Sequence, residues 1–243
     1  MNLNGILVYF SALSFVLSFL CLVFSPFVLH GKEVSSGVYA YQEAVGEVIL
    51  PFEWKVDVQE QIRIVSVYEK NKSFINSCFV DGSTWKWQLK DGEKHNIIAE
   101  RRDNELKISG IRNGESYEKT VQIDDRPWYQ PLSYSLRNFL SNQDQSMSFW
   151  TIRADTVEVT TLNVEKMGDE EILINEKLTL AQKVEVRAEG FYSHFWHGTY
   201  WYRKTDKIFL MYRSVHGLPG TTETVVELIG EPRLHSALMP SEQ

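Results

Sequence analysis

The chain has 243 residues, of which 43% are hydrophobic and 23% are charged, and its formal net charge is −7. This composition is typical of a folded chain with room for one large β domain or two small ones. Because the balance is acidic and no long basic run occurs, the sequence predicts no nucleic-acid partner.

The first 31 residues are predicted to direct the chain to a membrane. Residues 5–29 carry no charged side chain, and a helix of about 20 apolar residues crosses the hydrocarbon core of a bilayer. Two interpretations stay open, a signal peptide and an uncleaved membrane anchor. The segment lacks the basic start of a usual signal. As an anchor followed by Lys32, it would place the remainder inside by the positive-inside rule. This conflicts with the export that we expect.

The two cysteines are Cys21 and Cys78. Cys21 lies in the apolar segment, so Cys78 is alone if that segment is cleaved or embedded in lipid. A disulfide scaffold and a cysteine-based zinc site are thereby excluded. Cys78 is predicted to be a small buried side chain rather than a reactive thiol.

Residues 32–46 are expected to form an exposed linker, because Ser35, Ser36 and Gly37 resemble a flexible joint. From residue 47 onward, apolar and polar residues alternate with a period of two, as in residues 85–89 and 184–188. Turn dipeptides at 81–82, 91–92 and 113–114 separate these segments. A further turn is expected at Gly168–Asp169. The pattern predicts an antiparallel meander of ten to twelve short strands.

One segment departs from the strand pattern. Leu132, Leu136, Phe139 and Leu140 recur at helical spacing, which predicts one short amphipathic helix that covers the sheet. The predicted fold is therefore mainly β. It is an antiparallel β-barrel or strongly curled half-barrel over residues 47–230, with one short helix, preceded by an N-terminal apolar helix within residues 1–31. Residues 231–243 are expected to be a loose tail.

Residues 190–226 hold the densest aromatic run. On a strand, Trp196, Tyr200 and Tyr202 share one face and Trp201 lies on the other, so both faces are aromatic. Such a strand is either packed into a core on both sides or lines a ligand cavity, as in lipocalin-sized barrels. The candidate ligand-binding residues are Trp196, Tyr200, Trp201, Tyr202, Arg203, Arg213 and His216. The arginines either meet an anionic head group or form ion pairs at the surface.

Catalytic and metal-binding patterns are absent from the sequence. His194 and His197 would point to opposite faces of a strand, so no metal site is predicted. No nucleophile elbow, zinc-protease motif, Walker loop or dinucleotide fingerprint occurs. We therefore predict no catalytic residues and no cofactor, although a catalytic pair assembled from distant strands stays open.

Four short segments carry a resemblance to a known family: Phe149-Trp150, residues 181–184, residues 195–203 and Gly217-Leu218-Pro219-Gly220-Thr221. Across its C-terminal half, the chain resembles a domain-of-unknown-function family of bacterial envelope proteins. The resemblance implies a periplasmic β-barrel or half-barrel, an export signal and a role near envelope lipids. It implies no established activity.

We therefore expect an exported protein of the bacterial periplasm or cell envelope, anchored in the membrane through residues 5–29 if these are not cleaved. Its expected role is non-catalytic: it would bind or carry an apolar or amphipathic ligand, such as a lipid, in an aromatic-lined β cavity. The alternative is a structural or assembly factor that binds another envelope protein through a sheet edge.

Overall fold

The computed structural model describes residues 36–69, 71–189, 196–216 and 222–234, and of residues 196, 215, 216 and 234 it describes the backbone alone. The predicted apolar helix within residues 1–31, and the choice between signal and anchor, lie outside these residues. No helix in the described part of the chain has both the length and the apolar character needed to span a bilayer.

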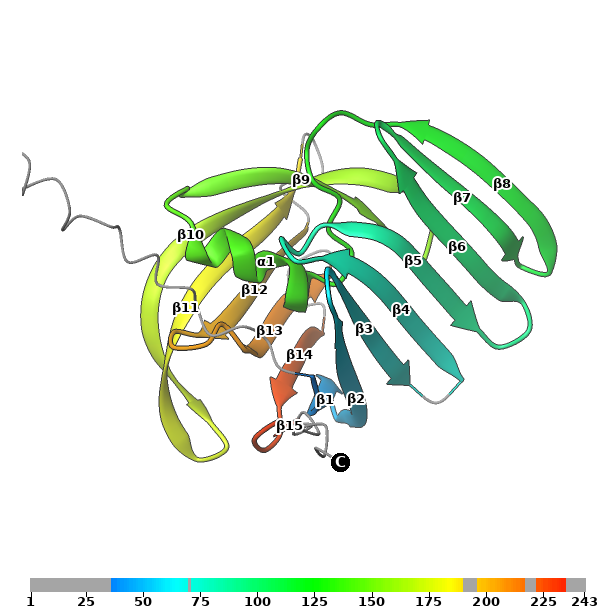
Figure 1. Ribbon diagram of the computed structural model, residues 1–243. Coiled ribbons are helices and arrows are strands. Elements are labelled where there is room, and N and C mark those ends of the chain that lie inside the picture. The colour runs from blue at the N-terminus through cyan, green and yellow to red at the C-terminus, as the bar shows by residue number, and fades with distance from the viewer. Residues whose placement is uncertain (1–35, 70, 190–195, 217–221, 235–243) are drawn as a thin grey trace, which may run out of the picture. The chain divides into compact units, whose positions relative to one another are not determined.

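Strands dominate the described part, which contains fifteen strands and one helix (Figure 1). In chain order the elements are β1 (Gly37–Val45), β2 (Val48–Gln59), β3 (Ile62–Glu69), β4 (Lys72–Phe79), β5 (Thr84–Asp91), β6 (His95–Arg102), β7 (Glu105–Arg112), β8 (Glu115–Gln122), α1 (Leu132–Ser141), β9 (Ser146–Ile152), β10 (Val159–Ile174), β11 (Lys177–Ala188), β12 (Trp196–Arg203), β13 (Phe209–His216), β14 (Glu223–Leu228) and β15 (Arg233–Leu234).

All the strands belong to one antiparallel sheet, in the order β8-β7-β6-β5-β4-β3-β2-β1-β14-β13-β12-β11-β10-β9, with β15 paired to β1. Most neighbours are consecutive hairpins. The exceptions are β1 with β15 and β1 with β14, and the second of these joins the two ends of the domain and places Tyr41 opposite Leu228. β8 and β9 end the path and do not pair with each other. The sheet is therefore strongly curled but open, which confirms the predicted half-barrel.

The helix packs within the curl of the sheet, between the β1–β4 side and the β10–β14 side (Figure 1). Its buried residues include Leu136, Phe139 and Leu140, three of the four that predicted it. The first turn is tied to the sheet, because the Tyr202 hydroxyl donates to the Leu132 carbonyl oxygen at 2.8 Å. The predicted role of the helix as a cover for the sheet is thus confirmed.

An extended segment before the helix links two distant parts of the sheet. The Thr84 amide at the start of β5 donates to the Trp128 carbonyl oxygen at 2.7 Å. On the other side, Tyr129 donates to the carbonyl of Trp150 in β9, and Trp150 donates to that of Pro127, both at 2.8 Å. Residues 127–130 therefore fasten the free edge of β9 to the N-terminal half of the sheet.

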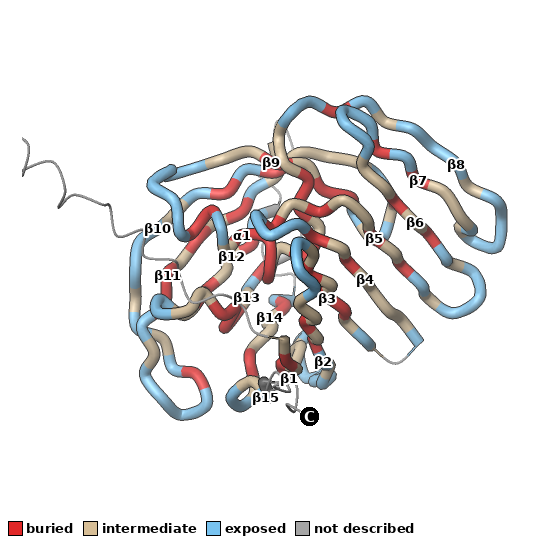
Figure 2. Tube along the Cα trace, in the orientation of Figure 1, coloured by how far each residue is buried: buried red, intermediate tan, exposed pale blue. Residues whose placement is uncertain are grey.

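Two hydrophobic clusters stabilise this arrangement. The larger surrounds α1, and the smaller packs beneath β5–β8 around Trp87 and Trp128. Along these strands buried and accessible positions alternate (Figure 2), as the period of two predicts. Cys78 belongs to the larger cluster and is fully buried. The prediction of a buried cysteine is therefore confirmed.

Three boundaries differ from the predictions. β1 occupies most of the predicted linker at 32–46, because Tyr39 and Tyr41 alternate into the core and are each 1% exposed. The predicted turn at Gly168 is a β-bulge within the 16-residue strand β10, since the register with β11 shifts between Lys166 and Gly168. Part of the predicted loose tail, Arg233–Leu234, pairs with β1.

Candidate ligand-binding site

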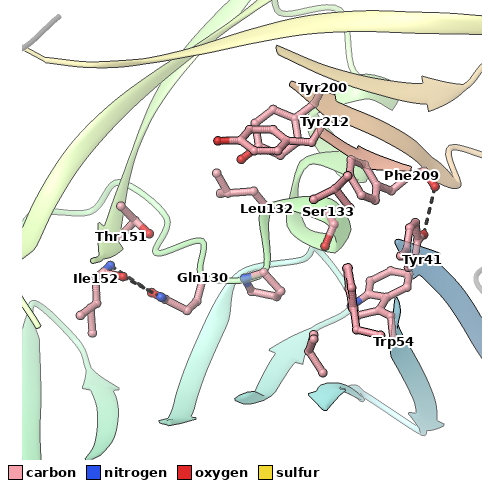
Figure 3. Close-up of a pocket in the computed structure, with 14 residues that line it drawn as sticks. Tyr41, Trp54, Gln130, Leu132, Ser133, Thr151, Ile152, Tyr200, Phe209 and Tyr212 are labelled. Carbon is pink, nitrogen blue, oxygen red and sulfur yellow. Dashed lines mark hydrogen bonds between the residues drawn. The ribbon is translucent and has the colours of Figure 1, made fainter. Parts of the chain in front are cut away.

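A cavity of about 340 Å³ opens between the first turn of α1 and the inner face of the curled sheet (Figure 3). Its walls come from both ends of the chain: β1–β3, the segment leading into α1, the end of β9, and β12–β14. The lining residues are Tyr41, Phe52, Trp54, Val67, Gln130, Pro131, Leu132, Ser133, Thr151, Ile152, Tyr200, Phe209, Tyr212 and Val226.

Aromatic rings make up most of the sheet's contribution to the cavity. Tyr200 and Tyr212 lie side by side on β12 and β13, with ring centroids 4.7 Å apart. Tyr41 stacks on Phe52 at 5.6 Å. These contacts follow from register, because Tyr200 lies opposite Tyr212 and Tyr41 lies opposite Phe52. The rings support one another and present apolar surface to the cavity.

The polar side chains in the wall are largely engaged with the protein. The Gln130 amide oxygen accepts from the Trp128 indole and the Ile152 amide, each at 3.0 Å, and its nitrogen donates to the Ile152 carbonyl at 2.7 Å. The Tyr41 hydroxyl donates to the Phe209 carbonyl at 3.0 Å. These bonds fix the shape of the wall.

Tyr41 and Tyr200 in the wall are neutral at physiological pH. Burial raises the pKa of Tyr41 well above its usual range, and the neighbouring Tyr39 adds to the effect. Burial also raises the pKa of Tyr200, with a further contribution from Tyr212. In Figure 3 the hydroxyls of Tyr200 and Tyr212 point toward the interior of the cavity. At Tyr200 the wall therefore carries a neutral hydroxyl group on an aromatic surface.

Strand β12 sends its predicted site residues to both faces of the sheet. Tyr200 lines the cavity. Tyr202 is fully buried beside it and holds α1 through Leu132. Trp201 points to the opposite face, where its indole donates to Glu170 and the Lys183 ammonium lies 5.5 Å from the ring centroid. Among these three aromatic residues, Tyr200 alone lines the cavity.

The remaining predicted residues lie elsewhere on β12 and β13. Trp196 and His216 face each other in the backbone register, and their side chains lie outside the described part. Arg203 pairs with Asp206 at 3.4 Å and with Glu231 at 3.1 Å. Arg213 is exposed and lies opposite Thr199, four positions along β12 from Arg203. This separation is about 13 Å along the strand, so the two arginines are not brought together.

Of the fourteen residues that line the cavity, the sequence predicted only Tyr200 as a site residue. Phe52 and Trp54 alternate with Glu53 on β2, which is a signal for two inward-facing aromatic residues. The sequence holds no comparable signal for the closure of β1 on β14, because strand pairing between residues so far apart is not encoded in local spacing. That closure is what places Tyr41 beside Phe209.

Reactive groups are sparse around the cavity. Burial raises the pKa of the Cys78 thiol to about 12, and the thiol lies within 3.8 Å of the Thr84 hydroxyl. Within the described ranges, no three His, Cys, Asp or Glu side chains lie close enough together to hold a metal ion.

Comparisons with known proteins identify the fold. No family model matches the chain, and no curated protein matches its sequence. The structure is similar to a β-barrel-like protein of the domain of unknown function DUF1849 from Brucella abortus, with a TM-score of 0.58 and 8% identity over 84% of this chain and 99% of that one. A weaker similarity exists to the hypothetical lipoprotein YmcC from Escherichia coli, with a TM-score of 0.42 and 11% identity over 80% of this chain and 84% of that one. Another exists to a LolA superfamily protein from Nitrosomonas europaea, with a TM-score of 0.25 and 7% identity over 84% of this chain and 88% of that one.

The similarity to the DUF1849 protein bears on fold alone, because the two sequences share so few residues. It confirms the predicted barrel-like architecture and the resemblance to a domain-of-unknown-function protein. The likeness in fold covers 84% of this chain.

Proposed function

We propose that this protein is a non-catalytic binder or carrier of an apolar or amphipathic small molecule, such as a lipid, in the bacterial cell envelope. The observation that carries the proposal is the aromatic-lined cavity of about 340 Å³. Ligand sites of proteins are concave and mostly apolar, with volumes of about 300–1,000 Å³ and a few well-placed polar groups.

The size of the cavity sets the scale of the ligand. A group of the size of a water molecule takes about 30 Å³, so 340 Å³ accommodates about ten such groups. This matches one medium-length alkyl chain better than the two long chains of a phospholipid. Because the cavity is open, a longer chain can extend into solvent or toward a partner.

The envelope location rests on the sequence of residues 1–31, which we expect to direct export. Whether they are cleaved or anchor the chain, the remainder would meet envelope lipids. An apolar cavity beside a lipid surface has a ready source of ligand.

The test fills the cavity without altering the rest of the sheet. Val226 on β14 lines the cavity, whereas its neighbour Val225 lies opposite Arg213 on the other face of the same strand. We expect Val226→Trp to occupy part of the cavity and exclude ligand. Val225→Trp is the matched control, with the same change in volume at the adjacent residue.

The measurement is native mass spectrometry of the protein recovered from its own host, followed by organic extraction of bound molecules. Wild type and Val225→Trp should carry the same lipid-like adduct, and Val226→Trp should lose it while keeping its far-ultraviolet circular dichroism. An adduct-free wild type that also takes up nothing from a lipid mixture would overturn the proposal.

The alternative, binding of an envelope protein through a sheet edge, would use β8, which pairs with β7 alone. Six of its eight residues are exposed. However, Glu115, Glu118 and Lys119 place charges along this edge, and edge charges discourage the addition of another strand. The composition of β8 therefore favours the cavity as the functional site.

A further inference from the structure

The cavity wall is built from uncharged groups of two kinds. Hydrocarbon and aromatic side chains provide the apolar part. The polar members are Tyr41, Gln130, Ser133, Thr151, Tyr200 and Tyr212. Hydroxyl and amide groups donate and accept hydrogen bonds without carrying a charge. Among the described residues, those that surround a ligand in this cavity are therefore apolar or neutral hydrogen-bonding groups.

The hydroxyl of Tyr200 is placed to bind a ligand. The Tyr41 hydroxyl donates to the Phe209 carbonyl oxygen at 3.0 Å, and the Tyr202 hydroxyl donates to the Leu132 carbonyl oxygen at 2.8 Å. The Tyr200 hydroxyl has no such partner within the described part of the chain, and it points toward the interior of the cavity (Figure 3). A hydroxyl that loses water when a ligand binds requires an acceptor in exchange. A well-matched ligand therefore places an oxygen lone pair beside Tyr200.

The surroundings of this hydroxyl disfavour a charged group. Burial raises the pKa of Tyr200 well above its usual range, so a negative charge on an oxygen at this position is destabilised. An ionised carboxylate or phosphate in the same place would lose its water and find only neutral partners in the wall. The cost of that desolvation is far larger for an ion than for a neutral oxygen.

Two carboxylates flank the wall on the β1–β3 side. Glu43 lies two positions beyond Tyr41 on β1, which places it on the same face, and it lies opposite Val226 of β14. Glu69 lies two positions beyond Val67 of β3, on the face that lines the cavity. Burial raises the pKa of Glu69, and the Glu43 carboxylate adds to this effect. The two carboxylates are therefore close enough to repel each other.

A lysine beside these carboxylates does not reverse their sign. Lys72 opposes the rise in the pKa of Glu69, and its ammonium lies 3.7 Å from the Asp91 carboxylate. Three carboxylates and one ammonium leave net negative charge on this side of the wall. An anionic head group that stays outside the cavity here would be repelled.

We infer that the ligand is an uncharged amphiphile, a single hydrocarbon chain that ends in an alcohol, ester or amide. The oxygen of this group accepts a hydrogen bond from the Tyr200 hydroxyl, and the chain lies against Phe52, Phe209 and Val226. Ionised fatty acids and lipid phosphates are excluded as ligands. This inference rests on the proposed function and names the chemical class of its ligand.

The experiment is displacement of the apolar dye N-phenyl-1-naphthylamine from the protein recovered from its host, at pH 8. Four competitors share one chain length: dodecanol, dodecanoate, dodecyl phosphate and dodecylammonium. Dodecanol should displace the dye at about a tenth or less of the concentration that each charged competitor requires, because an ion loses more on desolvation than a neutral hydroxyl. The ammonium also has no lone pair to accept from Tyr200.

Variants separate the contribution of the wall from the general hydrophobicity of the competitors. Tyr200→Phe should weaken dodecanol by about threefold or more, the effect of one neutral hydrogen bond, while the dye still binds. Tyr68→Phe makes the same chemical change at a side chain that is 52% exposed and outside the cavity, and it should leave dodecanol unchanged.

The flanking carboxylates are tested together. Glu43→Gln combined with Glu69→Gln should reduce the preference for dodecanol over dodecanoate by about threefold, because two repulsive charges are removed. Glu115→Gln removes a carboxylate from an exposed residue of β8, the strand at the end of the sheet, and should leave the preference unchanged.

The outcomes separate the two proposals. If neither the dye nor any competitor binds, the proposed function fails and the inference fails with it. If the dye and the charged competitors bind and dodecanol binds no better than one of them, the inference alone is overturned. It is also overturned if Tyr200→Phe binds dodecanol as wild type does, or if Tyr68→Phe weakens it equally. An unchanged preference in the double glutamine variant contradicts the part assigned to Glu43 and Glu69, as does an equal change in Glu115→Gln.

Discussion

Tyr200 and Tyr202 are two inward-facing residues on β12. Comparing them measures how much one hydrogen bond between α1 and the sheet contributes to stability. Removing the Tyr202 hydroxyl by Tyr202→Phe deletes a 2.8 Å hydrogen bond to the Leu132 carbonyl, made between residues 70 positions apart. A typical intramolecular hydrogen bond contributes about 1 kcal/mol net. Because Leu132 begins α1, its carbonyl can keep an intrahelical bond from Leu136, so the larger penalty of a buried orphan acceptor does not apply. The expected loss is therefore about 1 kcal/mol.

Tyr200→Phe is the matched control. The Tyr200 ring keeps its contacts with Tyr212 and Phe209, at 4.7 and 6.0 Å, when the hydroxyl is removed. The hydroxyl itself points into the cavity (Figure 3). We expect the free energy of unfolding to change by less than about 0.5 kcal/mol.

Urea unfolding followed by circular dichroism measures both variants, and thermal unfolding provides a second reading. For a domain of this size, 1 kcal/mol corresponds to a shift of about 2–4 °C in Tm. Equal stability of Tyr202→Phe and wild type, or equal losses in the two variants, would refute the argument that this bond holds the helix to the sheet.

Three further predictions follow from the structure. Cys78 should resist alkylation in the native protein at pH 8, because burial raises its thiol pKa to about 12. Since the folded pKa exceeds the unfolded value, the stability linked to this thiol should be full below about pH 9 and fall as the pH rises toward 12, as measured by urea unfolding. Gly110→Ala should lower stability by about 3 kcal/mol in thermal unfolding, because φ is +138° and the new Cβ would lie 2.0 Å from a carbonyl oxygen of β6. Gly92→Ala, whose new Cβ would have nothing within 4 Å, should lower stability by about 1 kcal/mol. The Arg126 side chain is the main reason why the pKa of the Asp124 carboxyl is lower than usual. The stabilising effect of this carboxylate should therefore persist to lower pH than usual and disappear on further acidification. NMR titration should show a higher Asp124 pKa in Arg126→Gln.

Local patterns were enough to predict most of the fold. The alternation of apolar and polar residues identified the strands, and Asn113-Gly114 identified one of the tight turns between them. Helical spacing identified α1 because its core-facing residues recur at three- and four-residue intervals. These features depend on the nearest neighbours of each residue, so they are visible without a structure.

The errors arose where tertiary context overrides local composition. Serine and glycine before Val38 suggested a linker, yet Tyr39 and Tyr41 find a core and the segment becomes a central strand. Gly168 looked like a turn, but a positive φ of 103° is also what a bulge in a long strand requires. In the first case the partner strand, β14, lies far away in the sequence. In the second case the sequence does not specify the register with the partner strand β11.

The candidate site was harder to predict than the fold for the same reason. Sequence reasoning selected the aromatic run on β12 and found Tyr200, but the partners of that residue come from β1, β2 and the entry to α1. These elements meet only when β1 pairs with β14 and the helix docks inside the curl. The site is thus a product of the longest-range contacts in the domain.

Assembly of the cavity from distant segments has a thermodynamic consequence. A ligand that binds only when β1–β3, α1 and β12–β14 are together stabilises the whole domain by mass action, and the gain increases with the logarithm of ligand concentration. A ligand in the cavity would contact Leu132 and Ser133 of α1 as well as the sheet, in addition to the bond from the Tyr202 hydroxyl to the Leu132 carbonyl. The empty protein would then be the state in which α1 is held least firmly, which is the property expected of a carrier that must open to load and release its ligand.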